Sequence, residues 1–240
     1  MKQENWYDVD TARGGDFSLS NAFPILMRKV FVWMTLALAI TGITAYGVDS
    51  SPALVGMIFS SKVMFWGLII AEFGLVMAIS GAINRLSLAT ATLLFILYSV
   101  VNGATLSVIF LAYSTTVIAK TFFITAGTFG AMALVGYTTK TDLTSIGKLL
   151  FMALIGIIIA SVVNIFVGSS GLDLIISYVG VLVFVGLTAY DTQKIKEMCR
   201  MAPDAGESMQ KLALLGSLSL YLDFVNLFLY LLRIFGNNKD

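Results

Sequence analysis

The sequence predicts an all-α polytopic membrane protein with seven transmembrane helices. Hydrophobic residues make up 58% of the 240 residues and charged residues only 12%, whereas a soluble domain has about 45–50% apolar and about 25% charged residues. Only three prolines interrupt the chain, which suits long unbroken helices. A globule of this size cannot bury so much apolar surface. The composition therefore excludes a soluble enzyme, a nucleic-acid-binding protein and a disordered chain.

Seven apolar runs reach the roughly 20 residues that a membrane helix needs. They cover residues 28–48, 63–83, 87–111, 117–137, 147–168, 172–193 and 212–235. The runs are too long for barrel strands and lack their period of two. Small residues within the runs are expected to let helices pack closely: Gly103, Ala104, Gly127, Gly130, Gly156, Gly180 and Gly186.

Polar segments flank these runs. Residues 1–26 are expected to form a flexible polar tail, residues 27–236 the transmembrane domain, and residues 237–240 a short C-terminal tail. We expect no signal peptide, because a long charged segment without a small-residue cleavage site precedes the first apolar run.

The distribution of Lys and Arg predicts a cytoplasmic N-terminus. With this orientation eleven of the fifteen basic residues lie on the inner side, and the four on the outer side are Lys62, Lys120, Arg233 and Lys239. Seven spans then place the C-terminus outside, unless the last segment re-enters the membrane instead of crossing it.

Missing residue types exclude several kinds of site. The chain has no histidine, so a His-dependent catalytic triad and a histidine metal site are excluded. A single cysteine, Cys199, excludes an internal disulfide and a thiolate zinc site. The net charge of +1 gives no field that would attract polyanions.

Five of the charged residues within the apolar runs or at their ends need an explanation, because a charge inside the membrane costs at least about 2.5–3.5 kcal/mol. Glu72 lies in the middle of the second span and Arg85 at its inner end. Asp191 lies near the inner end of the sixth span, and Asp223 lies deep in the seventh. Arg233 lies near the outer end of the seventh span. Glu72 is either a structural partner of Arg233 or a cation-attracting group in a pore.

The two aspartates are expected at similar depths on adjacent helices. Asp191 precedes Lys194 by three residues, which is about 5 Å at a rise of about 1.5 Å per residue, and Asp223 is expected one or two turns deeper. A polar stripe on the seventh span recurs at steps of three and four, and it consists of Ser219, Asp223, Asn226, Tyr230 and Arg233. The stripe is either a seam of hydrogen bonds between helices or a water-accessible face.

Two carboxyl groups in a partly dry pocket have specific chemistry. Removal from water favours the neutral acid and like charges repel, so Asp191 and Asp223 would share a proton near neutral pH and titrate as a pair. Arg85 beside Asp191 would favour its ionised form, which gives a two-state latch that pH could operate. Deprotonated carboxylates also offer the hard oxygen ligands that calcium prefers. A static buried ion pair plus one neutral aspartic acid is the alternative.

Two segments resemble motifs of the transmembrane Bax inhibitor motif family, also called the Bax inhibitor-1 family. The segment from Gly186 to Ile195 resembles its sixth-helix signature, and the segment from Ser217 to Arg233 resembles its seventh helix. The resemblance extends over residues 22–236. It implies a fold with the seventh helix central and two groups of three helices around it.

For function, the same resemblance implies a pH-sensitive calcium leak in which Asp191 and Asp223 are the aspartate pair, Arg85 is the latch and Glu72 is the second-helix acid. For bacterial relatives it also implies modulation of a membrane-bound protease, and for eukaryotic relatives suppression of cell death.

We therefore expect a passive, pH-gated calcium pathway in a bacterial inner membrane. Asp191 and Asp223 would be sensor and metal ligands, and the partners would be the lipid bilayer and calcium ions, with no tightly bound cofactor and no nucleic acid. An intramembrane aspartyl protease is one alternative, and Tyr190 followed by Asp191 fits one of its motifs. Asp223 lacks the glycines of the other motif, so we expect no enzyme. The second alternative is a regulator of a membrane protease or another partner, without transport activity.

Overall fold

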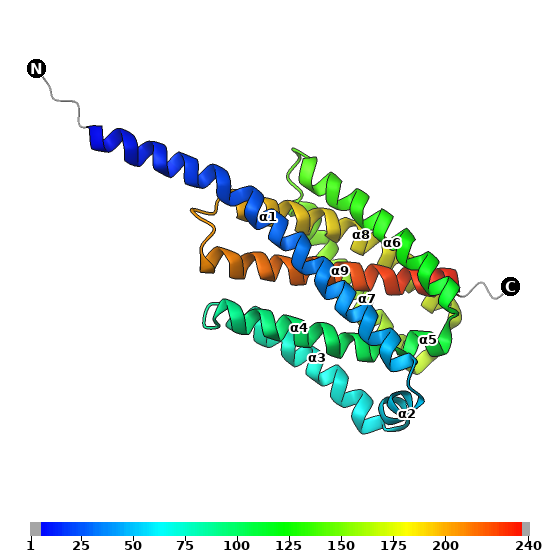
Figure 1. Cartoon of the computed structure of the whole chain (residues 1–240). Helices are drawn as coiled ribbons and strands as arrows, with labels where there is room; N and C mark the ends of the chain where they lie inside the picture. Colours follow the sequence, from blue (N-terminus) through cyan, green and yellow to red (C-terminus); the bar gives the residue numbers. More distant parts are fainter. Residues whose placement is uncertain (1–5, 237–240) are drawn as a thin grey trace, which may run out of the picture.

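The computed structural model describes residues 6–236, and this part of the chain forms helices and no strand (Figure 1). The helices, in chain order, are α1 (Trp6–Asp49), α2 (Pro52–Ser60), α3 (Lys62–Ala82), α4 (Leu88–Leu106), α5 (Val108–Ala112), α6 (Thr115–Thr138), α7 (Thr144–Val167), α8 (Ser170–Arg200) and α9 (Glu207–Gly236).

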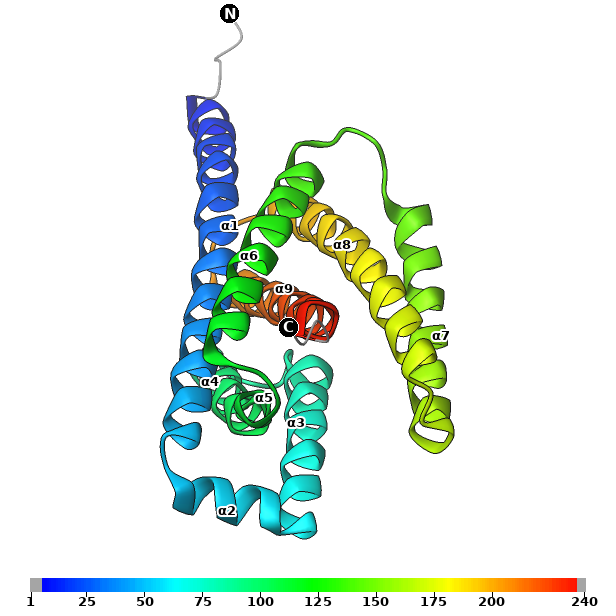
Figure 2. The ribbon, with the colours of Figure 1, turned by 90° about the vertical axis from the view of Figure 1, so that its right-hand side faces the viewer.

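The seven predicted spans are confirmed. Seven helical segments are long and apolar enough to cross a membrane, namely Ala22–Asp49, Lys62–Ala82, Leu88–Ala112, Thr115–Thr138, Thr144–Val167, Ser170–Arg200 and Glu207–Gly236. The third of them combines α4 and α5, which meet at Ser107. The short helix α2 connects the first two spans and lies across their ends (Figure 2). The chain is thus a multi-pass membrane protein.

Most of the N-terminal segment belongs to the first helix. Helix α1 begins at Trp6 and continues through Pro24 into the first span, so residue 26 marks no break in the helical backbone. The part of α1 before Ala22 extends beyond the other helices in both views (Figures 1 and 2).

The seventh span, α9, is central, as the family resemblance implies. Helix α9 packs against α1, α4, α6 and α8. When the molecule is viewed along the axis of α9, this helix lies in the middle of the bundle (Figure 2). About two thirds (67%) of its apolar window is buried, compared with 6% for α3 and 11% for α7. Those two spans are peripheral, because α3 packs mainly on α4 and α7 mainly on α8.

Glycines permit the closest helix crossings. A Cβ atom added at Gly136 of α6 would collide with the backbone of Ala189 on α8. One added at Gly103 of α4 would lie 2.6 Å from the carbonyl oxygen of Thr41 on α1. Close packing is confirmed for three of the predicted glycines, which are Gly103, Gly180 and Gly186. The prediction is wrong for Gly127, Gly130 and Gly156, where an added Cβ would have no neighbour within 4 Å.

Candidate functional site

Helices α8 and α9 carry the predicted aspartate pair and run antiparallel. Gly216 of α9 lies against Ile195 of α8, and Gly180 of α8 lies against the ring of Tyr230 on α9. This register places Asp191 opposite residue 220 of α9. Asp223 therefore lies within about one helical turn, or about 5.4 Å, of Asp191 along the helix axis.

The two carboxyl groups lie in partly different surroundings. Asp223 is only 5% exposed, and its Oδ2 atom is buried without a hydrogen-bond partner. Asp191 is half-buried and also lies within reach of the charge of Lys194. The two groups are close enough for a charge on Asp191 to repel a charge on Asp223. The structure thus places the two predicted residues near each other, but no hydrogen bond joins their carboxyl groups among the described residues.

Buried threonines flank Asp191 on α8. Thr188 and Thr192 are both inaccessible to solvent. The Thr188 hydroxyl donates to the carbonyl oxygen of Phe184 at 2.7 Å, whereas the Thr192 hydroxyl is buried and has no partner. The aspartate pair therefore lies in a region where two buried oxygen atoms, Asp223 Oδ2 and Thr192 Oγ1, lack hydrogen bonds. The sequence analysis did not select Thr192, although it follows Asp191 directly.

Arg85, the predicted latch, does not contact the aspartates in this structure. It lies with an exposed side chain in the turn between α3 and α4, because α3 already ends at Ala82. Among residues 22–236, whose side chains the structure describes, the ion pairs are Arg200–Glu197 at 3.6 Å and Arg233–Asp173 at 3.5 Å.

The turn that carries Arg85 is fastened to α9. The Glu207 carboxylate accepts a hydrogen bond from the backbone N–H of Leu88 at 2.9 Å. The Lys211 ammonium group donates to the carbonyl oxygen of Leu86 at 3.0 Å. If Arg85 moved toward the aspartates, these two hydrogen bonds would have to break, or the start of α9 would have to move together with the turn.

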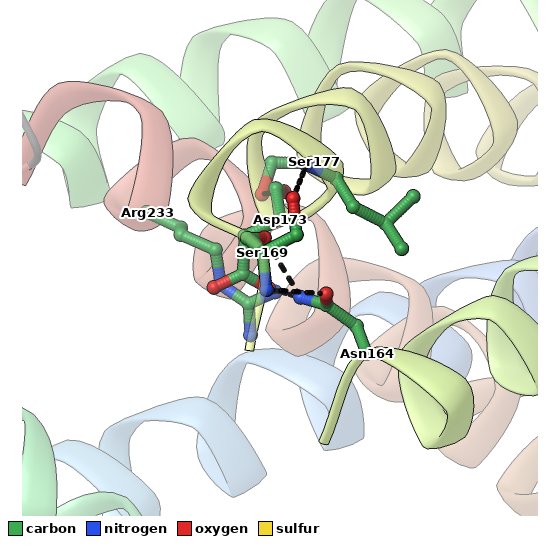
Figure 3. Close-up of polar contacts among 6 residues, drawn as sticks. Asn164, Ser169, Asp173, Ser177 and Arg233 are labelled. Atoms are coloured by element: carbon green, nitrogen blue, oxygen red, sulfur yellow. Dashed lines mark hydrogen bonds and ion pairs between the residues drawn. The ribbon is translucent and has the colours of Figure 1, made fainter. Parts of the chain in front are cut away.

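Arg233 pairs with Asp173 of α8 (Figure 3). It forms no ion pair with Glu72 among the residues whose side chains are described. Asp173 also accepts a hydrogen bond from the Asn164 amide of α7 at 3.1 Å. The same amide closes the α7–α8 turn, because it donates to the Ser169 carbonyl oxygen and accepts from the Ser169 backbone N–H. Of the two interpretations of Glu72, the ion pair with Arg233 is therefore not the arrangement in this structure.

Glu72 instead lies beside Asn102 and Thr105 of α4, and its Oε1 atom is buried without a hydrogen-bond partner. Asn102 Oδ1 accepts a hydrogen bond from the Tyr221 hydroxyl at 2.8 Å. The Tyr221 oxygen lies 2.7 Å from the Thr41 hydroxyl of α1. A polar cluster thus joins α1, α3, α4 and α9 in the interior of the bundle.

The sequence analysis missed this cluster beyond Glu72. Tyr221 is fully buried, and the rings of Phe95 and Tyr98 meet it edge-on at centroid distances of 6.0 and 5.6 Å. The sequence could have indicated the cluster through Tyr221, which lies inside the seventh-helix motif, because a buried tyrosine hydroxyl needs a hydrogen-bond partner.

Comparison with known proteins assigns the chain to a family. The profile of the family described as inhibitor of apoptosis-promoting Bax1 matches residues 24–240. The chain belongs to the Bax inhibitor-1 family.

Other members of the Bax inhibitor-1 family are similar over most of their length. The inner membrane protein YbhL of Escherichia coli (strain K12) is 50% identical over 214 residues, which cover 89% of this chain and 92% of YbhL. An uncharacterized protein of Borreliella burgdorferi is also 50% identical, with the same coverage. The uncharacterized protein RP147 of Rickettsia prowazekii is 45% identical over 216 residues, 89% of this chain and 90% of that protein. Together with the seven spans, these relatives support a bacterial inner membrane protein.

This Bax inhibitor-1 protein offers few metal ligands at the aspartate pair. Across residues 22–236, whose side chains the structure describes, no three or more Cys, Asp or Glu side chains gather where they could hold a metal ion. Asp191 and Asp223 supply two carboxyl groups, whereas a resident calcium ion takes 6–8 oxygen ligands. The two carboxyl groups alone therefore supply only part of the ligand set of a resident calcium ion.

Proposed function

We propose that this Bax inhibitor-1 protein is a pH-sensitive calcium leak pathway in which Asp191 and Asp223 hold a labile proton and line the path of the ion. One observation carries the proposal: the Asp223 Oδ2 atom is buried without a partner, and Asp191 lies within about one turn of it on the helix packed alongside.

The chemistry follows from the cost of buried charge. An ionised carboxylate away from water is costly unless a partner neutralises it. Two neighbouring carboxylates raise that cost through repulsion, so a proton or a cation is needed between them. A change in pH would change the proton occupancy of Asp191 and Asp223, and with it the charge that a passing calcium ion meets. Hard carboxylate oxygens suit calcium, and an incomplete ligand set lets the ion leave again.

Two further residues complete the proposal. Arg85 would act as the latch if the α3–α4 turn approached Asp191, and Glu207 and Lys211 hold that turn in its present position. Glu72, with its buried Oε1 and its neighbour Asn102, would attract cations farther along the path.

We also propose that the N-terminus is cytoplasmic, on the basis of the Lys and Arg distribution.

The test is calcium flux into liposomes that contain the purified protein, measured across neutral pH. Asp191→Asn and Asp223→Asn keep the size of the side chain and remove its titration, so both variants should lose the pH dependence of the flux. Asp204→Asn, an exposed acid in the α8–α9 connection, is the matched control and should behave like the wild type. The proposal is wrong if both variants keep the wild-type flux and its pH dependence.

A regulator without transport activity is the second candidate. The part of α1 before Ala22, which extends beyond the bundle, favours it because this helix offers backbone outside the spans for contact with a membrane protease or another partner (Figure 1). Co-purification of a partner from native membranes, together with no measurable calcium flux, would favour this candidate. Neither candidate requires enzymatic activity, and cleavage of a model membrane peptide that depends on Asp191 or Asp223 would overturn both.

A further inference from the structure

An apolar cavity opens between α1 and α6 within the membrane-spanning segments. Both helices pack on α9 but not closely on each other. The cavity between them has a volume of about 550 Å³ and is lined by ten residues of α1, α6 and α9, including Leu38, Gly42, Phe122 and Phe224. These four residues also line a smaller cavity of about 100 Å³, which continues toward α4 and α5. We call the two together the α1–α6 cavity.

The residues that line the α1–α6 cavity favour an apolar ligand. None of its lining residues is charged. The Thr35 hydroxyl already donates to the carbonyl oxygen of Phe31 at 2.8 Å, and the Thr41 hydroxyl already has two partners, the Ser99 carbonyl oxygen at 2.9 Å and the Tyr221 hydroxyl at 2.7 Å. A ligand with polar groups would lose its hydrogen bonds to water on entry and gain none, so the chemistry selects a hydrocarbon.

The dimensions suit a chain-like ligand. Along α1 the lining runs from Met34 to Ala45, which is about 16 Å at the rise of an α-helix. Ala39, Gly42 and Ala126 keep the walls open, and Phe224 forms part of the lining contributed by α9.

We propose that the α1–α6 cavity binds one acyl chain of a membrane lipid. The cavity lies inside the spans, where acyl chains are the surrounding solvent. A second copy of the protein fits poorly, because a stable interface takes about 20–30 residues a side, whereas the larger cavity is lined by ten. The bound chain would contact Phe224, which follows Asp223 directly on α9. An effect on the proposed leak depends on the proposed function, but the binding itself does not.

The experiment uses the full chain in phosphatidylcholine vesicles in which some lipids carry a photoactivatable diazirine in the acyl chain. After illumination, labelled residues are located by mass spectrometry. We expect strong labelling of half-buried Leu38 and Ala126, above that of Ile70 on α3, although Ile70 is 69% exposed. If labelling merely follows exposure, the lipids form an ordinary annulus and the proposal is wrong.

A pair of glycine variants provides the control. Gly42 lines the cavity and Gly74 lies on α3, and an added Cβ would meet nothing within 4 Å at either position. Gly42→Leu should therefore fold normally, fill the cavity and abolish labelling of Leu38 and Ala126, whereas Gly74→Leu should leave it unchanged. Persistent labelling in folded Gly42→Leu protein, or cross-links between two copies through this face, would overturn the proposal. Because labelling is read without calcium flux, a failed leak proposal would not affect the result.

Discussion

Replacing Gly136 by alanine should force α6 away from α8 at the level of the aspartate pair. The added methyl carbon would lie 2.8 Å from the carbonyl carbon of Ala189 and 2.9 Å from its Cα atom. Carbon atoms in contact prefer a separation of about 3.5–4.0 Å, so the shorter of these two contacts alone requires the helices to separate by roughly 0.7–1.2 Å. The obstacle is backbone, which cannot rotate away as a side chain could.

The expected magnitude combines two opposing effects. Overpacking of a close contact costs about 1–3 kcal/mol, and the rigid backbone of Ala189 puts Gly136→Ala near the upper end. Replacing glycine by alanine inside a helix raises the free energy of unfolding by about 1 kcal/mol. We expect a net loss of about 1–2 kcal/mol. Gly130→Ala on the same helix meets nothing within 4 Å and should gain up to about 1 kcal/mol.

The assay is unfolding of the purified protein in detergent, followed by circular dichroism against temperature and denaturant. Gly136→Ala should unfold before the wild type and Gly130→Ala at or after it. If Gly136→Ala is as stable as Gly130→Ala, the close crossing of α6 and α8 is not present in the protein. Ala189 precedes Asp191 by two residues, so under the proposed function only Gly136→Ala should also change the pH dependence of calcium flux.

Three further perturbations test other parts of the structure. Tyr221→Phe removes a buried hydroxyl with two hydrogen-bond partners and should cost about 1 kcal/mol in detergent unfolding, whereas Tyr178→Phe at an exposed position should cost nothing. Hydrogen bonds from the side chain and backbone of Thr144 lower the pKa of Asp142, so their stabilisation is present above the unfolded-state pKa of about 3.9 and is lost as pH falls below it. The protection of amide hydrogens from exchange at the start of α7, taken relative to the intrinsic exchange rate at each pH, should fall in that acid range, and Asp142→Asn, which keeps the acceptor, should remove the step. Arg233→Gln breaks a half-exposed ion pair and should lower unfolding stability by less than about 1 kcal/mol, with the difference shrinking at high salt.

The spans could be predicted because hydropathy over about 20 residues is a local property. The depth of Asp191 and Asp223 in the membrane could also be predicted from the sequence, because counting residues along a helix measures distance along its axis. The direction in which each side chain points could not be predicted from the sequence. Arg233 lies near the depth expected for a partner of Glu72, yet it pairs with Asp173 on α8, because the choice among partners depends on how α9 is rotated against its neighbours.

The glycines show the same limit. Gly103 and Gly130 both lie within apolar runs, and only the packing of α4 on α1 makes the first a crossing point. The position of Arg85 depended on the end of a helix, and helix ends depend on local caps. Ser87 caps α4 by accepting a hydrogen bond from the Thr90 backbone N–H at 3.1 Å, and the preceding residues form the turn that removes Arg85 from α3.

The central position of α9 has a consequence for how the protein is made. A membrane protein is synthesised from its N-terminus, and each apolar span enters the bilayer before the helices associate. The helix around which α1, α4, α6 and α8 assemble comes after all of them in the chain. The earlier spans must therefore wait in the bilayer, with their inward faces against lipid, until the ribosome has delivered the final helix. A chain truncated before Glu207 would insert but would have no scaffold on which to assemble, and would be a target for membrane quality control.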